Sequence, residues 1–405
     1  MHLRLNELGS TLLDLRAYPS SRPRQNARLA PPTDREPFRY LVARPAVAAD
    51  LPAILQVARH VNLASMRAEE TKNKLAIEQS TRTLAGELPW QQGLLLLAAD
   101  LFPLHNKPCE LAGQVKLQVG WGGCWEKTRQ SRLFQASGVQ TWAEQECLSY
   151  KPNPHDEYAL ELAGLSVLPR HQGKRVARFL AQSWAIFVLL YQKELQRRIG
   201  TIAHLYANVL TADAQGKFPF YERVVRPLFG GLDYDSADHC RYARCNARSP
   251  MLDEFLDERG DQPRARIACH LLPEELRNDL GKVRPESMGC ARNLEQLGFC
   301  RTDKYDVLDG GQYFENTFAR LDATLKRREY MIRGVTERQM PVDAPRLTVA
   351  PSGRSMQSFR CVRAPCQIRG EEVLVSEGVF NALGVRRHEP VTVLQPGTPC
   401  REATP

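Results

Sequence analysis

The chain of 405 residues has no long apolar stretch. Its longest apolar runs, at residues 94–99 and 184–191, are far shorter than the roughly 20 residues that a membrane-spanning helix needs. The first residues, Met1-His2-Leu3-Arg4, begin no continuous apolar segment of the signal-peptide kind. We therefore expect no membrane partner and a cytoplasmic location.

The 11 cysteines include no Cys-x-x-Cys pair. An odd number without that spacing argues against a disulfide framework and favours a reducing compartment. A zinc site is the alternative, because His239 lies near Cys240 and Cys245, and Cys361 lies near Cys366. Neither group has a second pair at zinc-ribbon spacing, so we predict no metal ion.

The net charge of +9 fits an anionic partner, whether a nucleic acid, a membrane surface or a small molecule. Much of this charge lies in residues 16–35, a stretch of Pro, Ser and Arg that is typical of a solvated tail. No zinc-finger or helix-turn-helix pattern accompanies the charge. We therefore do not expect a nucleic-acid partner.

The periodicity divides the chain into four parts. Residues 1–37 form an irregular basic extension, residues 38–325 a mixed α/β region, residues 326–345 a charged linker and residues 346–405 a small β-rich module. Asp50 and Pro52 give the start signals of a helix. Residues 125–157 are polar and show no clear period.

The remaining elements follow from the spacing of apolar residues. We expect strands at residues 38–45, 94–99, 112–119, 158–167, 202–210 and 299–307, and helices at residues 68–84, 176–195, 221–229, 273–281 and 287–297.

Residues 160–180 combine a strand, an exit marked by Pro169, a short basic loop and an amphipathic helix. A helix N-terminus presents unpaired backbone N–H groups, which attract anions. Gly173 lets a phosphate approach the backbone, and Lys174 and Arg175 add positive charge. The segment therefore suits the pyrophosphate of a coenzyme, although an ordinary strand–turn–helix with a solvated basic turn fits equally well.

The pattern Val167-x-Pro169-x-x-Gln172-Gly173-Lys174-x-Val176-Ala177 resembles the acyl-CoA motif of the GNAT acyltransferases, Gln/Arg-x-x-Gly-x-Gly/Ala. Gln172 and Ala177 match the motif, whereas Arg175 replaces its central glycine. The resemblance implies a GNAT-like core that uses acyl-CoA as co-substrate, with a strand edge that holds the pantetheine arm. The implied coenzyme contacts are Leu165, Ser166, Val167, Gln172, Gly173, Lys174, Arg175, Val176 and Ala177.

Five further segments resemble the arginine N-succinyltransferase family, in order, over residues 39–395. They are Arg44-Pro45 before Asp50-Leu51-Pro52-Ala53, Glu161-Leu162 with Leu165, Pro219-Phe220-Tyr221, the run from Leu272-Pro273-Glu274-Glu275 to Gly281-Lys282-Val283-Arg284-Pro285, and Leu297-Gly298-Phe299 followed by Asp309-Gly310-Gly311. In the family a succinyl-CoA-binding leucine falls at Leu165. The chain is thus identified as a divergent member of this family.

The family resemblance implies transfer of an acyl group, succinyl or a related one, from a CoA thioester to the amine of arginine or a similar basic metabolite. It also implies a homo-oligomer, or a hetero-oligomer with a paralogue. The alternative is a GNAT-like protein with impaired catalysis that serves as a binding or regulatory protein.

Arg284 stands where the family has a proton-donor histidine. Arginine stays protonated, so it cannot accept a proton from an amine. Three interpretations stay open: Arg284 binds a carboxylate of a substrate, it forms a structural ion pair, or it marks a protein that has lost catalysis. A second departure is Ala207-Asn208-Val209-Leu210, where the family tends to have Glu-Met-Arg-Gly.

Two other residues are candidate catalytic groups. His270, in an apolar run, is a possible replacement base, or an ordinary core or surface histidine. Tyr221 is a possible aid to the departing thiolate, or an aromatic residue packed in a helix face.

Overall fold

The computed structural model describes residues 38–60, 68–103, 109–120, 124–136, 139–151, 158–209, 218–228, 231, 266–341 and 343–394. The extension expected at residues 1–37 and the cluster of His239, Cys240 and Cys245 lie outside these described residues.

The described strands are β1 (Phe38–Pro45), β2 (Leu94–Pro103), β3 (Glu110–Gly120), β4 (Cys124–Ala136), β5 (Val139–Lys151), β6 (Tyr158–Val167), β7 (Ile202–Val209), β8 (Arg266–Ala268), β9 (Cys300–Asp306), β10 (Gln312–Asn316), β11 (Arg327–Val335), β12 (Arg346–Pro351), β13 (Cys361–Arg369), β14 (Glu372–Ser376) and β15 (Pro390–Leu394). The described α-helices are α1 (Leu51–Arg59), α2 (Glu70–Ala85), α3 (Val176–Leu190), α4 (Gln192–Ile199), α5 (Arg226–Leu228), α8 (Glu274–Asp279), α9 (Met288–Gln296), α10 (Phe318–Leu325) and α11 (Glu377–Leu383). None of these helices is long and apolar enough to cross a membrane.

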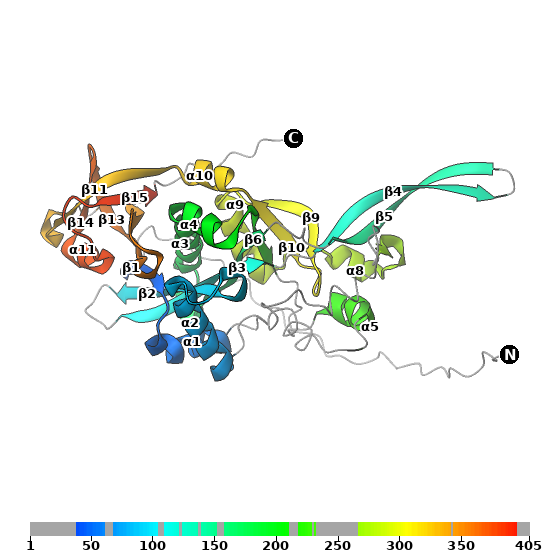
Figure 1. Cartoon of the computed structure of the whole chain (residues 1–405), viewed down its shortest axis with the longest axis horizontal. Coiled ribbons are helices and arrows are strands. Elements are labelled where there is room, and N and C mark those ends of the chain that lie inside the picture. Colours follow the sequence, from blue (N-terminus) through cyan, green and yellow to red (C-terminus); the bar gives the residue numbers. More distant parts are fainter. Residues whose placement is uncertain are drawn as a thin grey trace, which may run out of the picture. The chain divides into compact units, whose positions relative to one another are not determined.

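The described strands form one mixed sheet in the order β12-β15-β11-β14-β13-β1-β2-β3-β6-β7-β10-β9-β4-β5-β8 (Figure 1). Strands β1, β2, β3 and β6 are antiparallel neighbours. Strands β6 and β7 are parallel, and β7 continues antiparallel into β10. This arrangement confirms the predicted α/β class with a mixed sheet.

Helices cover both faces of the central strands. On α3, Val176, Leu180, Trp184 and Phe187 recur at helical spacing and are buried in the main core against β3 and β6. Helix α1 packs against the opposite face, where Ile54 joins a separate apolar cluster with β2. The core therefore holds β6 and the start of α3 in a fixed relation.

The C-terminal strands close on themselves, because β12 pairs with β13 as well as with β15. The resulting five-stranded ring encloses side chains that are mostly valine and isoleucine, among them Ile332, Val349, Val373 and Val391. Strands of the predicted β-rich module thus share a core with β11 and with Tyr40 and Val42 of β1. The division of the chain at residue 346 stays a prediction.

The prediction of a linker at residues 326–345 is wrong where β11 lies. Arg327–Val335 form β11, a strand of the ring that pairs with β14 and β15. Tyr330 and Ile332 point into the ring, and the residues between and around them are mainly charged and face outward. Charged residues dominate the composition of Arg327–Val335, so the sequence pattern did not predict a strand there.

Other local expectations also need correction. The polar segment without a clear period contains the hairpin of β4 and β5, paired from Cys124 with Lys151 to Ala136 with Val139. The helix expected at residues 176–195 divides at Tyr191 into α3 and α4. The helix expected at residues 221–229 begins with a π-helical turn.

Asp50 does not cap α1 with its side chain. Its carboxylate instead accepts hydrogen bonds from Arg44 Nη1 at 2.7 Å and from the Val47 N–H at 2.8 Å. Asp50 therefore binds Arg44 instead of the first backbone N–H groups of α1. A hydrogen bond between ionised groups is stronger than one to a neutral amide.

Candidate active site

Strands β6 and β7 form a fork. They pair in parallel from Tyr158 with Ile202 to Glu161 with Tyr206. Beyond this point, among the described pairings, β6 continues with β3 alone and β7 with β10 alone. The facing edges of residues 162–167 and 207–209 therefore carry backbone groups that no described strand pairs with.

A β-bulge at Gly164 bends β6 at the fork. Ala163 pairs with Lys116 and Ser166 pairs with Gln114, so β6 has one residue more than β3 over this stretch. Gly164 has a φ of 57°, which glycine adopts without strain, and Ser166 Oγ donates a hydrogen bond to the Gly164 carbonyl at 2.9 Å. Sequence reasoning missed Gly164, although a lone glycine inside a strand signals a bulge.

The loop after β6 leads directly into the N-terminus of α3. Gln172 Nε2 donates a hydrogen bond to the Val167 carbonyl at 3.4 Å, which folds the loop back on the strand end. The first hydrogen bond of the helix ladder runs from the Phe179 N–H to the Arg175 carbonyl at 3.0 Å. The N–H groups of Val176 and Ala177 precede this bond, as expected for a helix N-terminus that can receive an anion.

Arg175 takes the backbone conformation that the central glycine of the motif allows. Its φ is 61°, in the left-handed region, which costs an ordinary residue about 1 kcal/mol. Gly173 also has a positive φ of 75°, and among the described residues, apart from its two chain neighbours, no atom lies within 4 Å of the place where a Cβ would stand. The loop thus keeps an open backbone beside Gly173 in spite of the arginine.

Glu110, at the start of β3, anchors the loop through two basic side chains. Its carboxylate lies 2.7 Å from Arg170 Nη2 and 2.7 Å from His171 Nε2. Burial lowers the pKa of His171 against the opposing pull of Glu110. Burial raises the pKa of Glu110, but Arg170 and His171 outweigh it, so the net pKa is lowered.

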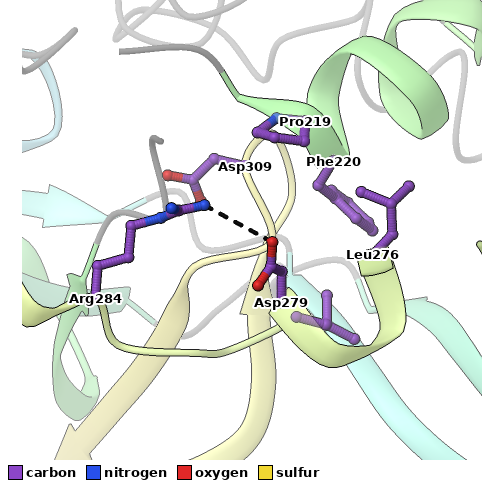
Figure 2. A pocket seen from close by; sticks show the side chains of 7 residues that line it. Pro219, Phe220, Leu276, Asp279, Arg284 and Asp309 are labelled. Atoms are coloured by element: carbon purple, nitrogen blue, oxygen red, sulfur yellow. Dashed lines mark ion pairs between the residues drawn. The ribbon is translucent and has the colours of Figure 1, made fainter. Parts of the chain in front are cut away.

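Arg284 lies in a separate small pocket (Figure 2). The residues that line this Arg284 pocket are Pro219, Phe220, Leu276, Asp279, Leu280, Arg284 and Asp309. The Arg284 Nη2 atom is 3.9 Å from Asp279 Oδ2, and Asp309 is almost fully buried. One cationic and two acidic side chains thus converge beside an apolar wall.

Glycines set the geometry of the Arg284 pocket. A Cβ at Gly281 would overlap the Tyr305 ring, and one at Gly311 would stand 2.7 Å from the Val209 carbonyl. The Gly281 N–H donates to the Gly310 carbonyl at 3.0 Å, which ties the loop of Arg284 to the turn before β10. Close packing therefore explains the glycines at Gly281 and Gly311 in these two runs.

The coenzyme-like loop and the Arg284 pocket belong to the same edge of the sheet. The loop follows the carboxyl end of β6, and Gln312, beside the pocket's turn, pairs with Val209 at the carboxyl end of β7. Because β6 and β7 are parallel, their carboxyl ends lie at the same end of the sheet. Open α/β sheets bind ligands at the carboxyl ends of their strands. The structure thus brings the predicted coenzyme residues and Arg284 to one edge.

The other two predicted catalytic residues, Tyr221 and His270, are not among the residues that line the Arg284 pocket. Tyr221 is completely buried in an apolar cluster with Trp125 and Leu148, a position that fits the packing interpretation. His270 follows β8, and its Nδ1 atom lies 3.1 Å from Gln145 Nε2 on β5. In the strand order β8 stands five places from β7. A catalytic role for either residue stays a prediction.

Among the described residues, no group of three or more His, Cys, Asp or Glu is placed to hold a metal ion. Cys361 and Cys366, the described pair that suggested zinc, stand an odd number of positions apart on β13. Their buried side chains consequently belong to different cores, one under α3 and one inside the C-terminal ring.

Comparison with known proteins gives the class and the family. Residues 41–323 match the family described as the arginine N-succinyltransferase beta subunit. Arginine N-succinyltransferases from Salmonella paratyphi B, Salmonella newport and Salmonella typhimurium are each 23% identical to the chain over 359 residues, which covers 87% of this chain and 97% of theirs. The structure of arginine/ornithine succinyltransferase subunit AI from Pseudomonas aeruginosa superposes with a TM-score of 0.68 at 19% identity, over 89% of this chain and 100% of that one.

The fold, the fork and the family match together define an acyltransferase. Because the matched segment spans well over half of the chain, the protein belongs to the arginine N-succinyltransferase beta subunit family.

Proposed function

We propose that the protein transfers a succinyl or related acyl group from a CoA thioester to the amine of arginine or a similar basic metabolite, within a GNAT-like core. The observation that carries this proposal is the fork: a bulged strand with an open edge that runs directly into a helix N-terminus. The family match supports the acyl donor and the acceptor.

The coenzyme would bind mainly through backbone groups. The edge of β6 at Leu165, Ser166 and Val167, with which β7 no longer pairs, would bind the amides of the pantetheine arm as a neighbouring strand does. The N-terminus of α3 would receive the pyrophosphate, with Lys174 and Arg175 adding positive charge. The residues present fit this role, because Gly173 leaves the backbone accessible.

The Arg284 pocket would recognise a substrate carboxylate. A guanidinium binds a carboxylate through two parallel hydrogen bonds, and Arg284 is the cationic side chain among the residues that line this pocket. Asp279 and Asp309 would favour a cationic end of the same ligand, and Phe220 and Leu276 would contact its aliphatic part. A basic amino acid combines these three features.

The reaction needs little covalent help from the protein. A neutral amine attacks the thioester carbon, and the thiolate leaves readily because the pKa of a thiol is only about 8.5. Holding the two reactants together supplies much of the rate. Arg284 stays protonated and therefore takes no part as a base.

The second candidate function is a binding or regulatory protein without turnover. It is favoured by one observation, the arginine at the position of the family's proton-donor histidine. The cytoplasmic location and the oligomeric state stay predictions.

Purified protein incubated with succinyl-CoA and arginine, with free thiol followed over time, tests the two functions. The enzyme releases thiol only when both substrates are present, and mass spectrometry finds the acylated amine. A panel of other acyl-CoAs and basic amines covers related substrates. A protein that CoA stabilises against heat but that releases no thiol with any pair would refute the enzyme and support the binding protein.

A further inference from the structure

A buried carboxylate and a phenol stand at the apex of the fork. Glu161 and Tyr206 form the last pair between β6 and β7. The Tyr206 hydroxyl donates a hydrogen bond to Glu161 Oε2 at 3.1 Å, and Gln118 Nε2 donates to the same oxygen at 2.8 Å. Glu161 is 6% exposed and Tyr206 is 1% exposed, so the pair is withdrawn from bulk water.

Both side chains point to the sheet face opposite α3. Leu160 and Leu162 pack in the core under α3, and strand alternation turns Glu161 the other way. On β7, Leu205 lies in the same core, which likewise turns Tyr206 away from α3.

Packing holds the phenol in one position. The ring of Tyr206 stacks on that of Tyr313 at a centroid distance of 5.3 Å. A Cβ at Gly120 would overlap the Tyr206 hydroxyl, so the glycine allows this ring to reach Glu161. The carboxylate therefore receives its hydrogen bond from a fixed donor.

We propose that Glu161 is the catalytic residue that accepts the amine proton, and that Tyr206 is a positioning residue that holds its carboxylate. This inference rests on the proposed acyl transfer. The described pairing of β6 with β7 ends at Glu161 and Tyr206, so a thioester carbonyl bound between the two strands beyond this pair would stand beside the carboxylate. Burial of a carboxylate is costly, and a role in proton transfer accounts for its presence at this point.

The step balances without a further reactant. The amine nitrogen forms a bond to the thioester carbon, and the carbonyl electron pair moves to oxygen. Glu161 accepts the proton that the nitrogen loses. The electron pair on oxygen then reforms the carbonyl and the C–S bond breaks, after which the thiolate takes the proton from Glu161. The products are an amide and a free thiol, and the carboxylate is regenerated.

A second carboxylate offers a matched control. Glu315 lies on the neighbouring strand β10, opposite Tyr206 in the register. It is bound by Lys304 Nζ at 2.7 Å and lies 3.8 Å from His204 Nε2, so its charge is already balanced. The change of Glu315 to Gln therefore removes a carboxylate from the same region without removing the proposed base.

The test compares Glu161→Gln, Glu161→Asp, Tyr206→Phe and Glu315→Gln with the wild type, by kcat, KM for each substrate, CoA affinity by calorimetry and thermal unfolding. We expect Glu161→Gln to lower kcat by about 100- to 10,000-fold, the usual contribution of a general base, with CoA affinity within about threefold. Glu161→Asp should restore part of the rate, Tyr206→Phe should lower kcat about tenfold at unchanged KM, and Glu315→Gln should change little.

A Glu161→Gln variant that folds and keeps kcat within tenfold of the wild type would overturn the inference. An equal loss of kcat and CoA affinity would also overturn it, since that pattern indicates a structural role. If Glu161→Gln fails to fold, Tyr206→Phe and Glu161→Asp serve as the test. A lower kcat at kept CoA affinity supports the inference, and an equal loss of both overturns it. An inactive wild type refutes the proposed function and this inference with it, whereas an active wild type with an active Glu161→Gln refutes the inference alone.

Discussion

The coenzyme loop and the Arg284 pocket lie at one edge of the sheet but depend on different parts of the chain. The loop offers backbone N–H groups and an open strand edge, so Arg175 can replace a glycine and keep the backbone shape. The proposed role of the Arg284 pocket depends on side chains, and there an arginine in place of the histidine that the family resemblance implies would alter the chemistry. Backbone sites thus tolerate sequence change where side-chain sites do not.

The largest expected effect is on the glycines that shape the Arg284 pocket. Gly281 has a φ of 67°, and a Cβ there would overlap Tyr305. We expect Gly281→Ala to lower the free energy of unfolding by about 2–4 kcal/mol, from overpacking and the left-handed backbone together. Denaturant titration measures this change.

Gly289→Ala is the matched control. Gly289 lies in α9, and nothing stands within 4 Å of its Cβ position, so the same change should stabilise the protein by about 0.5–1 kcal/mol. Equal stability of the two variants would contradict the packing account of the pocket.

The second prediction separates the two regions directly. We expect Arg284→Gln to raise KM for the amine about 10- to 100-fold, because the carboxylate loses a bidentate partner, while CoA affinity stays within about threefold. The KM of Arg284→Lys should lie between those of the wild type and Arg284→Gln, since lysine keeps the charge but cannot form two parallel hydrogen bonds. Steady-state kinetics and calorimetry measure both quantities. An unchanged KM in both variants would leave Arg284 as a structural ion pair.

The third prediction concerns the arginine in the loop. Arg175→Gly should raise the free energy of unfolding by about 1 kcal/mol, because glycine takes the left-handed conformation without strain. Coenzyme affinity should stay within about threefold if backbone groups carry the phosphates. Arg175→Ala removes the same charge but keeps the strain. Loss of more than tenfold in affinity in both variants would show that the side chain, not the backbone, binds the coenzyme.

The smallest effect is a pH dependence of the loop. Burial lowers the pKa of His171 below its ordinary 6.5, so at intermediate pH the unfolded chain binds a proton that the folded chain does not. The stability linked to this group is present above 6.5 and is lost as the pH falls through the lower folded value. The unfolding free energy of His171→Gln should therefore fall less steeply than that of the wild type as the pH drops from 6.5 to the lower folded value.

Much of the fold could be predicted from the sequence, because β6, α3 and β7 show clear periodicity. The family motifs also pointed to the loop after β6 and to Arg284, and the roles of both stay proposals. Strand β11 was missed since its charged residues face outward and mask the alternation, and the β4–β5 hairpin was missed because its polar sequence shows no clear period. Strands such as β11 are stabilised by pairing with strands distant in sequence. A local sequence pattern carries no information on these partners.

The fork itself needed the structure. The apex pair of Glu161 and Tyr206 lies on two strands separated by α3 and α4, so no spacing rule connects them. Asp309 likewise joins Arg284 in one pocket beside the contact of Gly281 with the turn before β10. Sequence reasoning found candidate residues within single segments and missed those that the fold brings together from different strands.

Strand β1 pairs with β2 on one side and with β13 on the other, Leu41 opposite Arg363. During synthesis, β1 can therefore pair with β13 only after nearly the whole chain has been made. Until then one edge of the sheet stays open to association with other chains. Completion of the sheet is a late folding step, and a chain truncated before β13 should aggregate rather than fold.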